Sequence, residues 1–156
     1  MLGKPLGIGI LSAALKKGRL GDDGYRAMVE TTTRLNDVGS ALAALDGVHA
    51  MTDVTGFGLL GHLLEMCRGA GLAARIAMSD DGFRTGASAR NWASYGAAVV
   101  LDPSLDGTPR ALLCDPQTSG GLLVACAPDA AADVVGVFHR AGFANAAVIG
   151  RMEDGP

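Results

Sequence analysis

Hydrophobic residues recur three and four positions apart in four parts of the chain, and this spacing predicts four helices. The first follows Asp22 and Asp23, which can cap its start, and the second ends at Asp46-Gly47. The last one opens with Pro128, which suits a first helical turn. The four helices are expected at residues 25–35, 38–45, 59–67 and 128–141.

Shorter apolar or alternating runs predict the strands. The apolar run at 6–11 contains two glycines and indicates a buried strand that another backbone approaches closely. Further strands are expected at 48–51, 72–78, 122–126 and 147–149, and a loop with room for one short helix at 79–96. Periodicity does not distinguish parallel from antiparallel neighbours. The alternation of elements therefore predicts an α+β domain with a mixed β-sheet covered by helices.

Length and composition exclude several classes of protein. The chain has 156 residues, 49% hydrophobic and 19% charged, so one folded domain over 1–156 is expected and a disordered segment is not. A net charge of −3 does not favour a nucleic-acid partner. The chain has no run of 18 or more apolar residues, so no transmembrane helix is expected. The three cysteines have no CxxC spacing, which predicts free thiols and a cytoplasmic location.

The first segment with candidate chemistry is residues 49–62. Asp53 stands at the end of a predicted strand, and the hydroxyls and glycines beside it are Thr52, Thr55, Gly56 and Gly58. One carboxylate next to the start of a helix can hold Mg²⁺ beside phosphates, because Mg²⁺ keeps water and phosphate oxygens as its other ligands. In the alternative interpretation, Asp53 or Thr55 only caps the helix and the glycines permit a tight turn.

The second segment is residues 113–123, a polar turn that leads into a predicted strand. Such a turn can form an anion-binding concavity, or it can be an ordinary β-turn set by Pro116. Its candidate residues on the phosphate side are Asp115, Gln117, Thr118, Ser119 and Gly120. Neither segment matches a Walker loop or a dinucleotide-binding glycine motif.

Four motifs together resemble the selenophosphate synthetase (selenide, water dikinase) family. They are Lys-Pro-Leu-Gly-Ile-Gly-Ile-Leu from residue 4, Thr-Asp-Val-Thr-Gly-Phe-Gly-Leu-Leu-Gly-His from residue 52, Arg-Asn-Trp-Ala-Ser-Tyr-Gly from residue 90, and Asp-Pro-Gln-Thr-Ser-Gly-Gly-Leu-Leu from residue 115. They cover the chain in the order of the family, but only its C-terminal half. The wider superfamily includes aminoimidazole ribonucleotide synthetase and implies the fold of its C-terminal domain.

The resemblance implies an ATP-dependent phosphotransferase that makes selenophosphate, AMP and phosphate from selenide, ATP and water. In the family the active site lies between two domains, with Mg²⁺ between the nucleotide phosphates and several aspartates. Asp53 matches the one aspartate that the C-terminal domain supplies. Most metal ligands, the reactive Cys or selenocysteine and an essential Lys belong to the N-terminal domain, which is absent here, so the chain alone is expected to be inactive. The full-length protein is expected to be a homodimer.

The chain departs from the family between Ile76 and Arg90, where it is short and has Arg-Thr-Gly-Ala-Ser-Ala from residue 84 in place of a Gly-Gly-Thr element. This departure leaves the role of Asn91 open. Two other functions also stay open: a superfamily enzyme that acts on a purine precursor, and a non-catalytic binding module that retains the fold.

Overall fold

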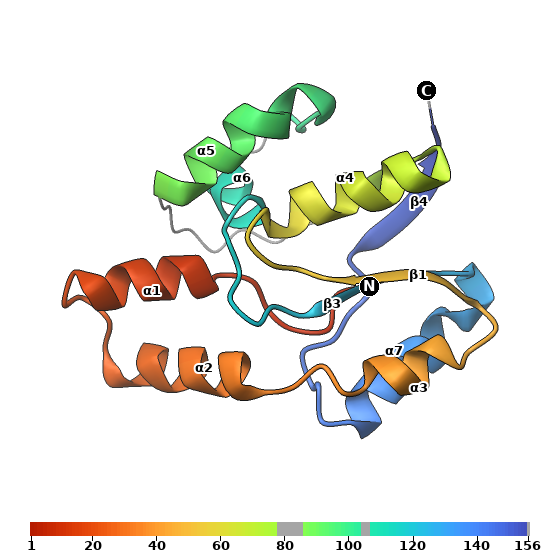
Figure 1. The fold of residues 1–156 in the computed structure, drawn as a ribbon, viewed down its shortest axis with the longest axis horizontal. Helices are drawn as coiled ribbons and strands as arrows, with labels where there is room; N and C mark the ends of the chain where they lie inside the picture. Colours follow the sequence, from red (N-terminus) through yellow and green to blue (C-terminus); the bar gives the residue numbers. More distant parts are fainter. Residues whose placement is uncertain (78–85, 104–106, 156) are drawn as a thin grey trace.

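The computed structural model describes residues 1–77, 86–103 and 107–155 of the chain. Three helices come first, and the strands that follow are separated from one another by helices. Two short 3-10 turns lie at Gly96–Ala98 and Pro128–Ala130. The helices and strands are α1 Ile8–Lys16, α2 Asp22–Thr33, α3 Gly39–Ala43, β1 Val48–Asp53, α4 Gly58–Ala70, β2 Leu72–Ile76, α5 Gly86–Tyr95, α6 Gly107–Leu113, β3 Leu122–Cys126, α7 Ala131–Arg140 and β4 Gly150–Asp154 (Figure 1).

The described strands form two antiparallel pairs. Strand β1 pairs with β3, so that Asp53 lies opposite Leu122, and β2 pairs with β4, so that Leu72 lies opposite Asp154. The predicted α+β class is confirmed, but two small antiparallel sheets stand where one mixed sheet was expected. Leu2 forms isolated antiparallel bridges to Leu123 and to Ala147.

The hydrophobic core lies on both faces of β3. Leu123 belongs to a cluster with side chains of α4 and α6, whereas Leu122 and Val124 belong to a cluster with α3 and α7. This split follows from the alternation of side chains along a strand. In Figure 1, α4, α5 and α6 accordingly lie on one side of the β1–β3 pair and α3 and α7 on the other.

Two predicted strands were wrong. Residues 8–11 of the run expected as a strand at 6–11 begin helix α1, because a short apolar run fits a helix as well as a buried strand. Gly7, with a φ of 114°, turns the chain into this helix. The strand expected at 147–149 lies instead at Gly150–Asp154, where polar residues on an exposed edge hide the alternation.

Helices α5 and α6 were underestimated. The sequence indicated one short helix within 79–96, and the structure has a ten-residue helix at Gly86–Tyr95. Gly107–Leu113 was not predicted as a helix, because seven residues with Pro109 give too short a pattern. The expected loop residues 79–85 and Met78 lie outside the described residues. Asp22 and Asp23 lie in the first turn of α2, and Gly21 is its N-cap.

Candidate functional site

The two polar segments singled out in the sequence lie side by side at one end of the β1–β3 pair. The amide of Val54 donates a 2.9 Å hydrogen bond to the carbonyl of Gly121, and the amide of Gln117 donates one of 3.0 Å to the carbonyl of Thr55. The loop between β1 and α4 therefore runs beside the loop that leads into β3 (Figure 1).

Two glycines permit this close approach. Gly58 has a φ of 71°, and a Cβ there would lie 2.7 Å from the carbonyl carbon of Cys114. A Cβ on Gly120 would overlap the carbonyl oxygen of Val54. Gly56, in contrast, has open space around its Cα and no positive φ. Gly58 and Gly120 are thus required by the packing of the two loops, whereas this packing does not require a glycine at position 56.

Asp53 is the acidic residue of this end of the sheet that faces solvent. Val54 is fully buried, and the alternation of side chains turns Asp53 outward. The N-cap of α4 is Phe57, without a side-chain hydrogen bond, so Asp53 and Thr55 do not cap this helix. Among the described residues, the Asp53 carboxylate has no hydrogen-bond or ion-pair partner. The capping interpretation is therefore wrong for Asp53.

One exposed carboxylate suits Mg²⁺ only if other groups complete the site. In the described part of the chain, no three His, Cys, Asp or Glu side chains gather closely enough to hold a metal ion. Mg²⁺ commonly binds one or two protein carboxylates and keeps water and phosphate oxygens for the rest. Asp53 therefore fits a shared Mg²⁺ site at the surface rather than a complete protein cage.

Thr55 is held by the helix that follows it. Its Oγ1 lies 3.1 Å from Nε2 of His62, a residue that is only 8% exposed. On the other side of the ring, Nδ1 lies 3.4 Å from a carboxylate oxygen of Glu65, which is long for a hydrogen bond. The ring of Phe57 packs against His62, with centroids 5.9 Å apart, although Phe57 is largely exposed. The Thr55 hydroxyl is thus positioned by α4, two residues after Asp53 in the chain.

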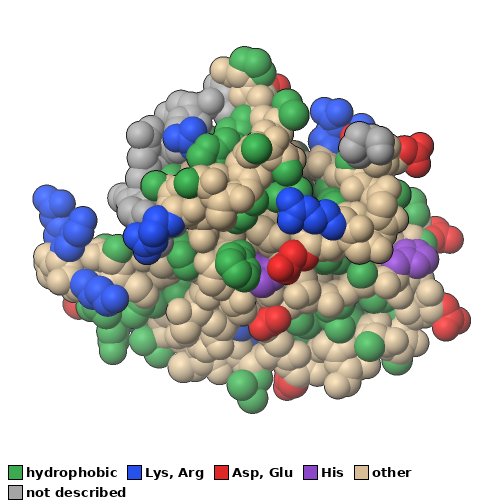
Figure 2. All heavy atoms as spheres, turned by 45° about the horizontal axis from the view of Figure 1, so that its top comes forward, with side chains coloured by type: hydrophobic (Ala, Val, Ile, Leu, Met, Phe, Trp, Pro, Cys, Tyr) green, Lys and Arg blue, Asp and Glu red, His purple; other side chains and the backbone are tan. Residues whose placement is uncertain are grey.

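The face of the molecule on the side of α4 and α5 carries both charged and hydrophobic side chains (Figure 2). Figure 2 shows a histidine with acidic and hydrophobic side chains near the middle of this face, and Lys and Arg side chains scattered around them. Negative and positive groups are therefore mixed on this face.

Helix α5 holds both loops together. The side-chain amide of Asn91 donates hydrogen bonds of 2.9 Å to the carbonyl of Gly56 and 2.8 Å to the carbonyl of Cys114. The hydroxyl of Tyr95 donates one of 2.7 Å to the carbonyl of Phe57, and burial raises the pKa of Tyr95, so it remains a donor at neutral pH. The open question about Asn91 is answered by this geometry: Asn91 joins the first segment to the second.

We expect Asn91→Ala to lower the free energy of unfolding by about 1–2 kcal/mol, because two carbonyls lose their donor. Urea denaturation of the chain measures this loss. Ser94→Ala is the matched control, since Ser94 is exposed on the same helix and donates only to the carbonyl of Asn91. An equal loss in both variants would show that Asn91 does not join the loops.

Asp115 and Gln117 face inward, toward the start of α1. Asp115 is fully buried, and one of its carboxylate oxygens accepts 3.2 Å and 3.1 Å hydrogen bonds from the Ile10 amide and the Gln117 side chain. The side-chain oxygen of Gln117 accepts a 3.2 Å bond from the Ile8 amide. Together they cap the free amides of α1. A phosphate-side role stays a prediction for Thr118 and Ser119, which are exposed, and for Gly120 through its backbone.

Sequence reasoning missed two polar residues that support the second segment. The ammonium of Lys4 is buried and donates to the carbonyls of Arg34, at 2.6 Å, and Ser119, at 2.7 Å. Burial, and to a lesser extent Arg34, lowers the pKa of Lys4. The side chain of Asn36 donates a 2.9 Å bond to the carbonyl of Gly120. Lys4 stands in the first of the four motifs, which was the only sequence signal for it.

The comparison with protein families decides the classification. Residues 1–156 match the family described as AIR synthase related protein, C-terminal domain. The chain belongs to this family. All three cysteines are free, in agreement with the predicted free thiols. Burial raises the pKa of the Cys114 thiol, as expected of an inert thiol. Throughout the described residues, every helix is too short or too polar to cross a membrane.

Curated proteins named selenide, water dikinase are similar to this AIR synthase related domain over its whole length. That of Pseudomonas straminea is 62% identical over 167 residues, which cover 99% of this chain and 47% of the relative. That of Burkholderia pseudomallei (strain K96243) is 60% identical over the same shares. The resemblance to the selenophosphate synthetase (selenide, water dikinase) family is confirmed. The chain spans less than half the length of these relatives.

Solved structures show the same fold. E. coli HypE superposes with a TM-score of 0.64 at 20% sequence identity, covering 98% of this chain and 42% of that chain. A second structure, described as a hydrogenase maturation protein HypE, gives a TM-score of 0.61 at 18% identity. The predicted superfamily fold is confirmed by the family match and by these neighbours.

The relatives also contain residues that this AIR synthase related domain lacks. The alignment with the Pseudomonas straminea protein extends over 167 residues, more than the 156 of this chain. The shortening between Ile76 and Arg90 stays a prediction of where these residues are absent. Residues 78–85 of that segment, which include Arg84 and Thr85 of the substituted element, lie outside the described residues. The other four residues of the element, 86–89, begin helix α5.

Proposed function

We propose that this chain forms the C-terminal half of a selenide, water dikinase, which makes selenophosphate, AMP and phosphate from selenide, ATP and water. The observation that carries the proposal is Asp53, an exposed carboxylate without a partner among the described residues, placed where the two glycine-containing loops meet. The similarity to proteins of that name over 99% of the chain supports it.

The residues around Asp53 would act by positioning and by charge. When bound at Asp53, Mg²⁺ would neutralise negative charge on nucleotide phosphates and so favour phosphoryl transfer. His62 orients the hydroxyl of Thr55, and Asn91 fixes the carbonyl of Gly56. Loops that are held in this way need no rearrangement when charge develops on the phosphates. Thr52, Thr118 and Ser119 are the further side chains that could face the nucleotide.

The remaining parts of the active site would come from the N-terminal half. One carboxylate is too few for the ATP and Mg²⁺ of a complete kinase site, so the other metal ligands and the group that meets selenide are assigned to that half. A homodimer of the full-length protein and a cytoplasmic location belong to the same proposal. The free thiols of this chain support the location.

A chimera tests the proposed function. The N-terminal half of the Pseudomonas straminea relative, fused to this chain, is expected to form AMP from ATP only when selenide is present, whereas the chain by itself forms none. AMP formation by the purified chain alone would contradict the division of the site. If the chimera instead converts a purine precursor without forming AMP, that result would favour a superfamily enzyme that acts on a purine precursor. A folded chimera inactive toward both would favour a binding module.

A further inference from the structure

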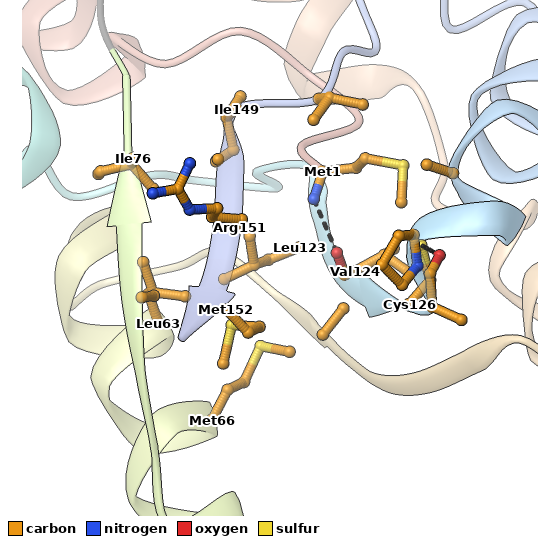
Figure 3. Close-up of a pocket in the computed structure, with 17 residues that line it drawn as sticks. Met1, Leu63, Met66, Ile76, Leu123, Val124, Cys126, Ile149, Arg151 and Met152 are labelled. Carbon is orange, nitrogen blue, oxygen red and sulfur yellow. Dashed lines mark hydrogen bonds between the residues drawn. The ribbon is translucent and has the colours of Figure 1, made fainter. Parts of the chain in front are cut away.

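An apolar groove separates the two sheets, between the free edge of β3 and the free edge of β4 (Figure 3). Its volume is about 400 Å³, and most of its lining is hydrophobic. In Figure 3, Met66 of α4, Met152 of β4 and Leu123 of β3 lie between the two strands, and Met1 lies at one end. None of the residues proposed to contact the nucleotide lines this groove.

The edge of β3 that faces the groove is already paired at one end. Met1 and Val124 exchange backbone hydrogen bonds of 2.7 Å and 3.0 Å, and the amide of Gly3 donates one of 2.9 Å to Leu122. In an antiparallel ladder the bonded residues alternate along each edge. The backbone groups of Cys126 therefore point to the same edge as those of Leu122 and Val124, into the groove.

The other side of this short pairing leads to the second sheet. Leu2 and Ala147 exchange hydrogen bonds of 3.0 Å and 3.1 Å, and the chain runs from Ala147 into β4 at Gly150. Leu2 thus lies between β3 and the segment that continues into β4. A strand that extended backward from Leu2 would stand between the two sheets and join them into one.

The two faces of the groove suit such a strand. Leu2 belongs to the cluster below α4, and Met1 belongs to the cluster with α7, as alternating strand residues do. A strand buried on both faces is apolar throughout, and the groove offers apolar side chains on both. Burial lowers the pKa of the Met1 amino group, whereas a peptide N–H in its place would make the same bond to Val124 without burying a charge.

We propose that the groove receives an extended, apolar strand formed by the residues that precede Met1 in the complete enzyme, antiparallel to β3 and continuous with Met1–Leu2. This strand would make the two described sheets a single one with the order β1-β3-strand-β4-β2. The inference rests on the proposed function only in taking this chain as one half of a longer protein. It needs no assumption about ATP, Mg²⁺ or selenide.

The pairing already present favours this occupant over others. A small apolar ligand would leave the backbone groups of Cys126 without partners, and unpaired backbone groups at a buried edge are unfavourable. A strand from a second copy would need the position that Met1 and Leu2 hold at the end of the groove. The relatives are more than twice the length of this chain, so a connecting segment exists in them.

Alkylation of Cys126 by N-ethylmaleimide, located by peptide mass spectrometry, tests the proposal. Cys126 is half-buried and lines the groove, whereas Cys67 and Cys114 are buried elsewhere and serve as internal controls for unfolding. The chain is compared with a version extended at its start by the segment of about six residues that precedes the matching position in the Pseudomonas straminea relative. The extension is expected to slow alkylation of Cys126 by about tenfold or more.

An extension of the same length made of glycine and serine is the matched control and should leave the rate unchanged. Equal rates for the chain and both extended versions would overturn the proposal. So would protection of Cys126 in the chain itself, accompanied by a dimer in sedimentation, because a second copy would then fill the groove. The proposal would also be overturned if the apolar and the Gly-Ser extensions slowed alkylation of Cys126 equally, because the protection would then not depend on an apolar strand.

A charge placed in the groove gives an independent measurement. In the chain as it stands, the long side chain of Met66→Lys can reach water through the open groove, so the melting temperature should change little. In the version with the apolar extension the same lysine would be covered, and the melting temperature should fall by roughly 5 °C more. Ala70→Lys, exposed at the end of the same helix, is the control and should act alike in both. An equal shift for Met66→Lys in both versions would contradict the proposal.

Discussion

Asp53→Asn is expected to lower selenide-dependent AMP formation by the chimera at least about a hundredfold, the equivalent of roughly 2.7 kcal/mol of lost transition-state stabilisation. Asparagine keeps the size of the side chain but removes the negative charge that would hold Mg²⁺ against phosphate oxygens. Asp53 is exposed and makes no cap, so the melting temperature should stay nearly the same. Initial rates at several Mg²⁺ concentrations and a thermal melt measure both quantities.

Asp46→Asn is the matched control for this variant. Asp46 is also exposed and stands just before β1, at the end of the strand opposite Asp53. The rate should remain within about twofold of the parent, because a distant surface charge contributes little. Raising Mg²⁺ should restore part of the activity of Asp53→Asn if weaker metal binding is the cause. A normal rate for Asp53→Asn at ordinary Mg²⁺ would remove Asp53 from the site.

Gly58→Ala is expected to lower the free energy of unfolding by more than about 3 kcal/mol or to prevent folding. The residue has a φ of 71°, and a methyl group there would lie 2.7 Å from the carbonyl carbon of Cys114. The backbone of Cys114 cannot move away easily, because its carbonyl also accepts from Asn91 and its side chain is fully buried. Urea denaturation of the chain measures the effect.

Gly56→Ala, two positions earlier in the same motif, separates packing from ligand binding. A Cβ at Gly56 meets no atom within 4 Å, and its φ is not positive, so stability should change by less than about 0.5 kcal/mol. In the chimera, however, Gly56→Ala should raise the KM for ATP if the nucleotide approaches this backbone. Equal destabilisation by both alanines would show that the contact between the loops does not depend on Gly58.

The longer helices and most strands could be predicted because their signals are local. Apolar spacing placed α2, α4 and α7, and short apolar runs placed β1 and β3. The same kind of run misplaced α1, since residues 6–11 are apolar enough for a buried strand and only the packed structure shows which element forms. Strand β4 was missed because its side chains, such as Arg151 and Glu153, form an exposed ion pair rather than an alternating pattern.

The candidate site divides in the same way. Asp53 and Thr55 could be named from residue types next to a predicted strand and helix, and Gly56 and Gly58 from their place in the motif. The direction of Asp115 could not, because its partner is the amide of Ile10, 105 positions away in the chain. A carboxylate in a polar turn suggests a ligand contact, and only the tertiary structure shows that this carboxylate is buried against α1.

The sequence alone determined the family, the α+β class and the candidate acidic residue Asp53, because motifs, periodicity and residue type can be read from short stretches of chain. The tertiary structure decided which polar residues remain accessible and which ones join the loops. It brings the ammonium of Lys4 into hydrogen bonding with the carbonyl of Ser119. It also lets the Asn91 side chain donate to the carbonyls of both Gly56 and Cys114. It also left a groove between β3 and β4 that no local pattern indicates. Hydrogen bonds and packing between distant segments depend on how the whole chain folds, so they are absent from any short stretch of sequence.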